Sequence, residues 1–376
     1  MSTNAETGAN ILVVNAGSSS LKLRVISADD RVVRREDLGP GDNDGLTAFV
    51  QACPPLVAVA HRIVHGGPEL CHTVRIDDAV RRELHAATDL APLHNPPALA
   101  AIAAVESLVP DVPGFVCFDT AFHSQLPDSA AIYPVPWEWT SRWGIRRYGF
   151  HGLSHAYAAR RAAGLLGRPP AQLRIVTCHL GAGASLCAVV SDHSIDTTMG
   201  FTPLEGLMMA ERSGTVDPGV LLWLVRTGRL SVEELEDGLE HRAGLAGVAD
   251  VPRGAFEEVQ RRADRGNERA ALALAMYEHR LRGGIAAMVA SLEGIDVLVF
   301  TGGVGERAWR MREEAGHGLG FFGVDIDHVR NRTVGDADAV VSAVDATVET
   351  VVVHSREDLE MSREVRRVLT PNRPPP

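Results

Sequence analysis

The chain has 376 residues, and its 37 Lys and Arg against 48 Asp and Glu give a formal net charge of −11. An acidic chain of this kind argues against general binding to nucleic acid. No apolar run reaches the length of a membrane-spanning helix, and no signal peptide precedes the first predicted strand, so we expect a cytoplasmic protein without a membrane partner. At this length we expect two domains, each large enough for its own core.

The cysteines give no indication of a metal site. There are five of them, an odd set without metal-type spacing. Cys117, Cys178 and Cys187 lie in apolar runs, which predicts reduced core thiols of the kind found in cytosolic proteins.

The first predicted element is a β-hairpin over residues 11–25, in which two apolar strands flank a small polar turn. Gly17 and the serines of the turn, including Ser18 and Ser20, leave backbone N–H groups and hydroxyls open to phosphate oxygens. Lys22 follows on the second strand and is the only lysine of the chain. Because lysine is a compact point charge and arginine a planar fork, this exception indicates a site that needs an ammonium group. The alternative interpretation is an ordinary serine-rich hairpin with a chance lysine.

Two buried strands are predicted next, and each leads into a charged residue. Residues 56–60 run into Arg62 just before a Gly-Gly turn, which is a common place for a functional side chain. Residues 114–118 end at Asp119, which is equally well interpreted as a turn former or as a site carboxylate. Residues 124–147 are expected to form a connection over the surface to the second domain. Helices are predicted over residues 77–89, 98–109, 156–165, 218–228, 231–240 and 266–293.

The second half of the chain repeats the opening design. Residues 174–189 form an apolar strand, a Gly/Ala/Ser turn and a second apolar strand, so that Ser185 and Cys187 correspond to Ser20 and Lys22. Two such hairpins indicate a duplicated α/β domain, in which two facing turns would hold a polyphosphate. Neither hairpin fits a single-turn nucleotide motif, because a strand and not a helix follows each turn.

Three further segments carry candidate polar groups. Arg and His gather over residues 146–155 at a predicted helix start, which suits an anion or, alternatively, is a capped helix with satisfied histidines. Arg212 lies in a polar, Gly-bounded segment and would by itself be interpreted as a solvated charge. Residues 297–300 form a strand that enters a glycine turn and a helix, a nucleotide-cradling pattern of moderate specificity. Residues 338–353 are expected to supply edge strands before a last helix that opens at His354.

Taken together, these segments resemble the acetate kinase family of the sugar-kinase/actin superfamily. The resemblance rests on eight motifs in order, at residues 15–22, 61–67, 91–97, 118–123, 148–155, 179–185, 199–209 and 303–306. It implies an α/β fold of two similar actin-like (ribonuclease H-like) domains with an interdomain cleft. The implied domains are residues 10–147, joined by the C-terminal helix 357–370, and residues 148–356, which would bind nucleotide and form a homodimer.

The resemblance also implies an activity, the reversible transfer of phosphate from ATP to acetate or propionate with Mg²⁺, or Mn²⁺ as an alternative. The partners would thus be a small carboxylate and a nucleotide. The implied catalytic residues are Asp119, His151 and Arg212, the acceptor-binding residues are Arg62, Val64, Leu93, Phe150 and Pro203, and the metal-side residues are Asn15 and Glu357. The implied donor-binding residues are Lys22, Ser18, Ser20, His179, Leu180, Gly181, Ala182, Gly183, Asp250, Arg253, Gly303, Val304, Gly305, Glu306 and Arg307.

Elementary chemistry fits these roles. Bringing an anionic acceptor to a phosphoryl group needs several fixed cations, which the arginines, His151, Lys22 and the metal would supply. An ionised carboxylate is already nucleophilic, so Asp119 is expected to position groups and not to act as a deprotonating base.

The donor half departs from the family pattern. Ala182 and Arg307 stand where the family usually carries Asn, and the segment 247–253 is shorter than usual. Two alternatives therefore stay open: an acyl kinase with another donor, such as a different nucleotide or pyrophosphate, or with another acceptor; and a non-catalytic protein that binds nucleotide or acyl phosphate.

Overall fold

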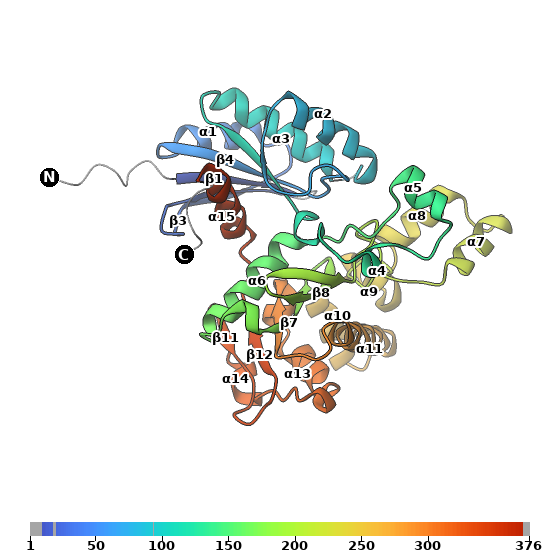
Figure 1. Ribbon diagram of the computed structural model, residues 1–376. Coiled ribbons are helices and arrows are strands. Elements are labelled where there is room, and N and C mark those ends of the chain that lie inside the picture. Colours follow the sequence, from blue (N-terminus) through green and yellow to red (C-terminus); the bar gives the residue numbers. More distant parts are fainter. Residues whose placement is uncertain (1–9, 18–19, 93, 371–376) are drawn as a thin grey trace. The chain divides into compact units, whose positions relative to one another are not determined.

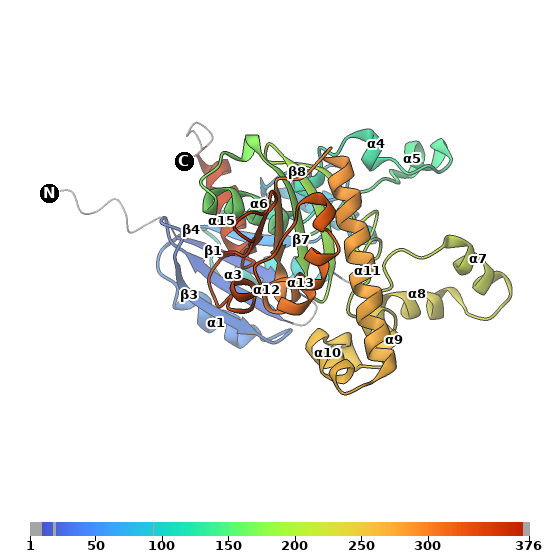
Figure 2. The ribbon, with the colours of Figure 1, turned by 90° about the horizontal axis from the view of Figure 1, so that it is seen from below.

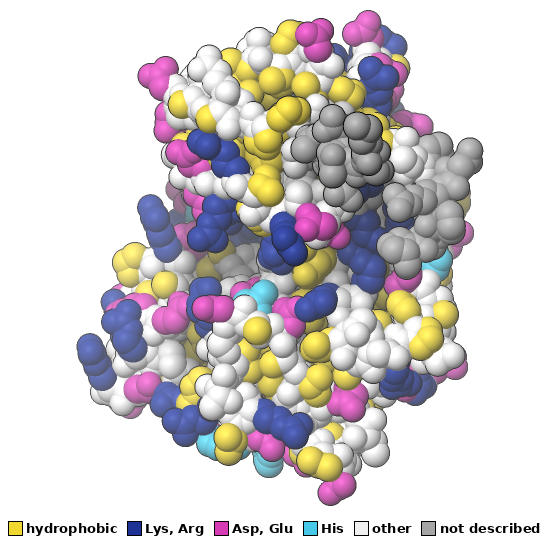
Figure 3. Space-filling model, turned by 90° about the vertical axis from the view of Figure 1, so that its left-hand side faces the viewer, with side chains coloured by type: hydrophobic (Ala, Val, Ile, Leu, Met, Phe, Trp, Pro, Cys, Tyr) yellow, Lys and Arg dark blue, Asp and Glu magenta, His cyan; other side chains and the backbone are white. Residues whose placement is uncertain are grey.

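The computed structural model describes residues 10–17, 20–92 and 94–370. Its contacts divide the chain into two compact units, Met1–Ser124 with Arg356–Pro376, and Gln125–Ser355. Among the described helices, none combines the length and the hydropathy that crossing a membrane requires. Acidic and basic side chains are interspersed over the face drawn in Figure 3, as expected for a chain of mixed charge.

The first unit is built on a mixed sheet with the strand order β3-β2-β1-β4-β6-β5. The strands are β1 (Asn10–Ala16), β2 (Leu21–Ile26), β3 (Val32–Leu38), β4 (Leu56–Ile63), β5 (Val74–Arg75) and β6 (Gly114–Phe118). The predicted hairpin is confirmed, because β1 and β2 pair antiparallel with Asn15 opposite Lys22. Strands β1, β4 and β6 run parallel to one another, so their carboxyl ends meet at one edge of the sheet.

Helices cover both faces of this sheet. Figure 1 shows α1, α2 and α3 on one face and α15 on the other. Their bounds are α1 (Asn43–Gln51), α2 (Asp78–Ala86), α3 (Asn95–Leu108) and α15 (Glu357–Leu369), with 3₁₀ turns at Ala87–Leu90 and Ala121–His123. Apolar residues of alternate strand positions, such as Leu12 and Val14, pack with Phe49 of α1 and Val105 of α3. Helix α3 begins three residues before the predicted start, because Pro96 and Pro97 supply the fixed φ angle that a first turn needs.

The second unit has a sheet of the same design, in the order β11-β12-β10-β7-β8-β9. Read from β9 to β11, this order matches that of the first sheet from β3 to β5. Its strands are β7 (Arg174–Leu180), β8 (Ala184–Val190), β9 (His193–Thr197), β10 (Val297–Thr301), β11 (Ala339–Val340) and β12 (Glu349–Val352). The second predicted hairpin is confirmed, and β7, β10 and β12 run parallel. The match between the two strand orders confirms the predicted duplication. The expectation of edge strands over residues 338–353 was wrong for β12, which lies between β10 and β11.

The helices of the second unit include a long central one, α11 (Glu268–Ser291), which lies against β8 in Figure 2. The others are α4 (Asp128–Ala131), α5 (Trp137–Trp143), α6 (Gly152–Leu165), α7 (Pro218–Arg226), α8 (Val232–His241), α9 (Gly244–Ala249), α10 (Phe256–Asp264), α12 (Gly302–Arg307), α13 (Trp309–His317) and α14 (His328–Arg332), with 3₁₀ turns at Pro170–Gln172, Pro252–Gly254 and Gly320–Phe322.

The division of the chain falls earlier than the predicted boundary after residue 147. Residues 125–147 carry α4 and α5 and group with the second unit. The backbone N–H of Arg147 donates to the carbonyl of Ala131 at 2.7 Å, and its guanidinium donates to the carbonyls of Thr198 and Met199. These hydrogen bonds attach the segment to the second unit, so it is more than a surface connection.

One histidine of the first unit lies buried in its core. His61 on β4 is 1% exposed, beside Val14 of β1 and Val116 of β6 in the strand register. Among the described residues, neither of its ring nitrogens has a hydrogen-bond partner. Burial lowers the pKa of His61 to about 3, with a smaller contribution from Arg81. The imidazole is therefore neutral at physiological pH and destabilises the fold.

His61→Leu should stabilise the protein, and the gain should grow as the pH falls. Below pH 6.5 the unfolded chain binds a proton that the folded imidazole cannot hold, so wild-type stability falls towards pH 3. Between pH 6.5 and 5.0 the difference in unfolding free energy between the variant and the wild type should increase by about 2 kcal/mol. Denaturant unfolding at both pH values measures it. His72→Leu at an exposed position provides the control, and an equal increase of the stability difference for that variant would contradict the assignment to residue 61.

Candidate active site

Three polar side chains of the first unit meet where its central parallel strands end. Asn15 is the penultimate residue of β1, Arg62 is the penultimate residue of β4, and Asp119 directly follows β6. The backbone N–H of Asp119 donates to the carbonyl of Ile63 at 3.1 Å and continues the pairing of the sheet. Carboxyl ends of parallel strands are the usual place for ligands in α/β sheets. Strand pairing therefore brings together residues that the sequence separates by up to 104 positions, from Asn15 to Asp119.

The guanidinium of Arg62 is the centre of this group. It forms a bidentate pair with Asp119, from Nε to Oδ1 at 2.8 Å and from Nη2 to Oδ2 at 2.6 Å. Its Nη1 donates to Oδ1 of Asn15 at 3.1 Å and lies 3.7 Å from Oε2 of Glu357. The amide of Asn15 in turn donates to the same Glu357 oxygen at 3.2 Å. Glu357 opens α15, so the last helix completes a set that begins on the first strand.

Burial and neighbouring charges have opposite effects on the pKa values of Arg62 and Asp119. Burial disfavours the charged form of Arg62, but Asp119 and Glu357 outweigh it and raise the pKa of the guanidinium. Burial raises the pKa of Asp119, and Arg62 offsets part of that rise. Arg62 is thus a permanent cation, whereas both Asp119 oxygens are occupied by its N–H groups. This geometry favours a positioning carboxylate over a deprotonating base, because the bidentate pair holds the carboxylate and the guanidinium in one mutual orientation.

Asn15 and Glu357 also fit the requirements of Mg²⁺. The amide nitrogen of Asn15 donates to the Glu357 carboxylate, so the two side chains lie together and offer an amide oxygen and a carboxylate, the hard oxygen ligands that Mg²⁺ prefers. Within the described residues no group of three or more His, Cys, Asp or Glu could hold a metal. Mg²⁺ commonly takes one or two protein oxygens and completes its shell with water and substrate phosphates, so a sparse set of this kind is sufficient.

The remaining expected residues of the first unit lie close by or cannot be placed. Lys22 is exposed on β2 opposite Asn15, and cross-strand partners share a face of the sheet. The carbonyl of Ser20 accepts from the N–H of Gly17 at 2.9 Å. Val64 follows β4 and is partly buried. The expected residues Ser18 and Leu93 lie outside the described residues.

In the second unit, His151 is held by a chain of hydrogen bonds. It caps α6 in the left-handed region at φ 56°, and the helix starts four residues before its predicted start. Its Nδ1 lies 2.9 Å from Oγ of Ser185, which lies 2.7 Å from Nε2 of His155. The other nitrogen of His155 lies 2.7 Å from Oγ1 of Thr177. His179 stacks on the His151 ring at 4.3 Å between centroids. The ring is therefore fixed in orientation on two sides, with its Nδ1 edge towards β8.

Arg212 and the Nε2 edge of the same ring both lie beside the turn between β7 and β8. A Cβ added to Gly183 would lie 3.3 Å from Nε2 of His151 and 3.8 Å from Nη2 of Arg212. The guanidinium donates to the carbonyl of Pro203 at 3.0 Å and lies 3.6 Å from Glu240. Burial lowers the pKa of Arg212, and Glu240 offsets part of this effect. In contrast to Arg62, Arg212 forms no bidentate pair with any carboxylate of the described residues, so its charge is available to an anion at the Gly183 turn.

The predicted glycine turns are present and pack against each other. The β7–β8 turn is closed by the N–H of Gly181, which donates to the carbonyl of Gly183 at 2.9 Å, and the Ala182 carbonyl accepts from Ala210. Gly302 has φ +78°, and a Cβ there would lie 2.7 Å from the carbonyl oxygen of Leu180. Only glycine fits such an approach. The strand–glycine–helix pattern at β10 and α12 is therefore confirmed, and it brings the segment Gly303, Val304, Gly305, Glu306 and Arg307 beside the end of β7.

Asp250 and Arg253 lie outside these turns. Both are in the left-handed region, at φ 55° and 59°, at the end of α9 and in the following 3₁₀ turn. The Arg262 guanidinium donates to the Asp250 carbonyl at 3.0 Å, and Glu257 of the same helix α10 pairs with Arg307 at 3.4 Å. Helix α10 thus links this segment to α12.

One residue behind α12 was missed by the sequence analysis. Arg312 on α13 is 1% exposed, although the helix was expected only to be charged. Its Nη1 donates to the carbonyls of Gly305 and Glu306, both at 2.8 Å, and the rest of its guanidinium bonds to Asn331. Burial lowers the pKa of Arg312 to about 10, so it stays protonated at neutral pH. Its position beside the apolar Met311 and Ala315 is the only sequence signal that could have indicated burial.

Arg312→Leu should destabilise the second unit strongly. The substitution leaves the carbonyls of Gly305 and Glu306 and two oxygens of Asn331, the side-chain Oδ1 and the backbone carbonyl, without this donor, which costs at least about 3 kcal/mol. Denaturant unfolding measures the loss. The matched control is Arg310→Leu on the same helix, because Arg310 pairs with Asp264 in solvent and such pairs contribute about 0–1 kcal/mol. Equal losses in the two variants would contradict a special role of the buried guanidinium.

The chain is similar to known proteins over most of its length. The Acetokinase family model matches residues 46–363. The acetate kinase of Gloeobacter violaceus is 50% identical over 324 residues, which cover 85% of this chain and 78% of that protein. The acetate kinase of a Nostoc species is 46% identical over 325 residues, 86% of this chain and 80% of that protein.

Solved structures give the same result. The crystal structure of Porphyromonas gingivalis acetate kinase superposes with a TM-score of 0.89 at 32% identity, over 96% of this chain and all of that one. A propionate kinase from Francisella tularensis superposes with a TM-score of 0.87 at 31% identity, over 95% and 98% of the two chains. The α/β fold of two similar domains expected from the sequence is thereby confirmed.

Proposed function

Because the chain belongs to the acetokinase family, we propose that it transfers a phosphoryl group reversibly from ATP to acetate, giving acetyl phosphate and ADP. The observation that carries the proposal is the placement of fixed cations at the ends of the central strands, with Arg62 in one unit and Arg212 beside His151 in the other. The proposal requires both sets to act on the same phosphoryl group, and the family relationship supports this.

The acceptor is proposed to bind as a carboxylate at Arg62. An acetate oxygen attacks the γ-phosphorus, and the bond from that phosphorus to the β,γ-bridging oxygen breaks, so that ADP leaves with the electron pair. No proton has to be removed from an ionised carboxylate. This agrees with the bidentate geometry of Asp119, which holds the guanidinium plane in one orientation.

The moving phosphoryl group spreads negative charge over its equatorial oxygens. Arg212 and His151 are proposed to stabilise that charge, since both face the Gly183 turn and their orientations are fixed by Pro203 and Ser185. Mg²⁺, with Mn²⁺ as an alternative, would be held on the Asn15 and Glu357 side and would neutralise the donor phosphates.

The acyl chain is proposed to contact Val64, Phe150, Pro203 and Leu93. Phe150 is 1% exposed and offers an apolar wall. Propionate is the second acceptor to consider, because one additional methylene changes the binding free energy by only about 1–3 kcal/mol. The propionate kinase among the structural relatives keeps this alternative open.

ATP is the proposed donor, with one specific reason to test others. The guanidinium of Arg307 lies 2.9 Å from where a Gly303 Cβ would be, and Glu257 holds it there at 3.4 Å. A bulky cation thus stands where the family usually has Asn, and Ala182 lacks an amide altogether. Both changes favour weaker ATP binding than in a typical member, or a smaller donor such as pyrophosphate.

The decisive experiment traps acyl phosphate as the hydroxamate, over a panel of ATP, GTP and pyrophosphate with C2–C4 acids. Product with acetate and ATP supports the proposal, and no product with any pair would contradict it. Arg62→Ala and Arg212→Ala should each lower kcat by about 10²–10³-fold, since each removes a fixed charge at the reacting group. The exposed arginines Arg75 and Arg265 provide matched controls, whose Ala variants should keep wild-type turnover.

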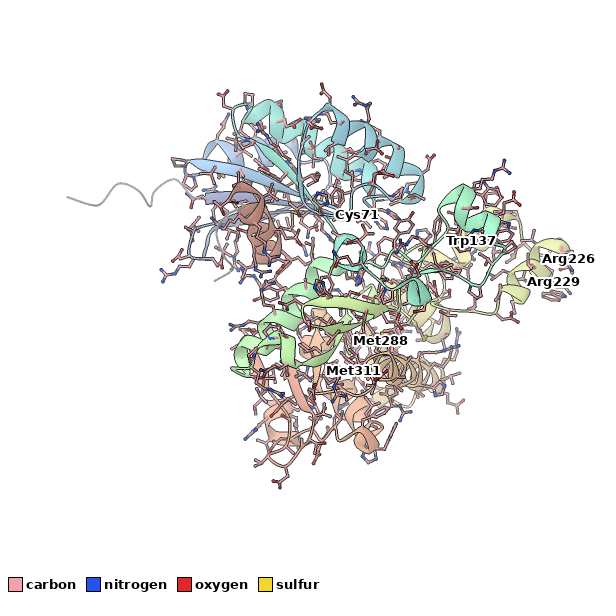
Figure 4. All side chains as sticks on the ribbon, viewed as in Figure 1. Cys71, Trp137, Arg226, Arg229, Met288 and Met311 are labelled. Carbon is pink, nitrogen blue, oxygen red and sulfur yellow. The ribbon has the colours of Figure 1, made fainter. Side chains whose placement is uncertain are left out.

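We further propose a cytoplasmic homodimer that associates through the second unit. Figures 2 and 4 show α7 extending away from the sheet of that unit, with Arg226 and Arg229 at its end, whereas Met288 and Met311 lie in the body. Helix α7 exposes Leu222 at 61% and Trp223 at 50%. Large exposed apolar side chains of this kind mark association surfaces.

Light scattering should give twice the chain mass of 40.3 kDa in dilute buffer. Adding a charge to the apolar face of α7 with Leu222→Asp should shift the mass to one chain, because burying an unpaired carboxylate in an interface is unfavourable. Val329→Asp on α14 is the control, since Val329 is exposed to a similar degree, 67%, on another helix. A wild-type mass of one chain would exclude the dimer.

A further inference from the structure

Three polar side chains that the proposed chemistry does not use form one cluster in the second unit. Arg147 donates from Nη2 to Oε1 of Glu205 at 2.8 Å, and the hydroxyl of Tyr133 donates to the other oxygen of Glu205. The guanidinium also lies 5.5 Å from the centroid of the Tyr133 ring. We call these residues the Tyr133 cluster. Burial and the hydrogen bond to Glu205 raise the pKa of Tyr133, so its hydroxyl stays protonated as a donor.

The Tyr133 cluster fixes the backbone that follows β9. Arg147 donates from Nη1 to the carbonyls of Thr198 and Met199 at 3.1 and 2.9 Å. The N–H of Phe201 donates to the Tyr133 hydroxyl at 2.9 Å. Any side chain on the intervening Gly200 would collide with Glu205 and Tyr133. The cluster thus closes tightly around residues 198–201.

This stretch is the junction of the two segments that carry the phosphoryl-binding groups. The carbonyl of Gly200 accepts from the N–H groups of Tyr148 and Gly149 at 3.1 and 3.2 Å, just before His151. Three residues after Gly200, the carbonyl of Pro203 accepts from Nη1 of Arg212 at 3.0 Å. A shift of residues 198–203 would therefore move His151 and Arg212 relative to each other.

The start of this stretch also borders a cavity. Thr198 and Arg147 line a space of about 390 Å³ together with Gly206, Leu207 and the middle of α11. Backbone next to a cavity lacks the dispersion contacts that fix a close-packed core. At Thr198, therefore, the hydrogen bond from Arg147 contributes a restraint that packing on the cavity side does not supply.

We infer that Tyr133, Arg147 and Glu205 are positioning residues, which set the spacing between His151 and Arg212 without touching the substrates. The inference rests on the proposed function. Both groups have to reach oxygens of one phosphoryl group, and a displacement of about 1 Å from a distant change can cost about 10²-fold in rate.

Tyr133→Phe is the sharpest test, because it keeps the ring under Arg147 and removes only the hydroxyl that joins Glu205 to Phe201. It should lower kcat about tenfold and leave the KM values for donor and acceptor within about twofold, since binding contacts stay while alignment is lost. Tyr277→Phe is the matched control. The described residues offer the buried Tyr277 hydroxyl no hydrogen-bond partner, so its loss should leave kcat unchanged.

A double-mutant cycle separates positioning from a general loss of structure. If Tyr133 acts through Arg212, Tyr133→Phe should change kcat by less than about twofold in an Arg212→Lys background. A full tenfold loss in that background would overturn the inference, as would a variant that loses thermal stability and keeps kcat.

A measurement that does not depend on turnover distinguishes a failure of this inference from a failure of the proposed function. Ring ¹⁵N spectra, with the His151 signals assigned by His151→Gln, should show those signals shifted by Tyr133→Phe and those of His61 in the other unit unmoved. Unshifted His151 signals would overturn the inference even in an active enzyme. If the wild type forms no acyl phosphate, the proposed function fails, and the ring spectra still decide whether the cluster sets the position of His151.

Discussion

The parallel pairing of β1, β4 and β6 is the constraint on which the candidate site depends. It brings Arg62 against Asp119, which lies 57 positions later in the chain. Because side chains alternate along a strand, a slip of β4 by one residue would turn Arg62 into the core and His61 towards the edge. The apolar neighbours of His61 exclude the guanidinium from that position, and the unpaired imidazole is the cost of the native register. The charged strand ends and the apolar core thus both require the native register of β4.

The two arginines differ in a way that matches two kinds of anion. Arg62 is held by a bidentate carboxylate, and a second carboxylate, Glu357, lies 3.7 Å away. In the proposed function, such a balanced cation would bind the single charge of the acceptor without holding it too tightly for release. Arg212 has a carbonyl and one carboxylate at 3.6 Å, so more of its charge is uncompensated in a partly buried place. A phosphoryl group in transfer carries the larger charge, and the less compensated arginine suits it better.

Local sequence patterns predicted the hairpins, the glycine turns and the charged strand ends, since each depends on neighbouring residues. Helix starts were placed late at α3 and α6, where Pro96 and the left-handed His151 begin the helix before the apolar pattern does. The contact between Asn15 and Glu357 was expected only through the family resemblance, because 342 positions separate them. Arg312 and Glu205 were missed because their partners lie on other elements, and an arginine or glutamate in a polar stretch resembles any solvated charge.

Duplication explains why one hairpin could keep a lysine and the other could not. The two sheets share one strand order, and β2 and β8 occupy the same position in it. Strand β8 is buried along nearly its whole length, with Gly284 of α11 packed so closely that a Cβ there would lie 2.7 Å from Leu186. Strand β2 leaves Lys22 exposed opposite Asn15. An ammonium group at Cys187 would be desolvated without a partner, which is unfavourable by several kcal/mol, about the whole stability of a small domain. After duplication, therefore, only the first hairpin could present an ammonium group, which lies opposite Asn15, whereas the second contributes its backbone turn and the side chains of Ser185 and His179 that hold His151.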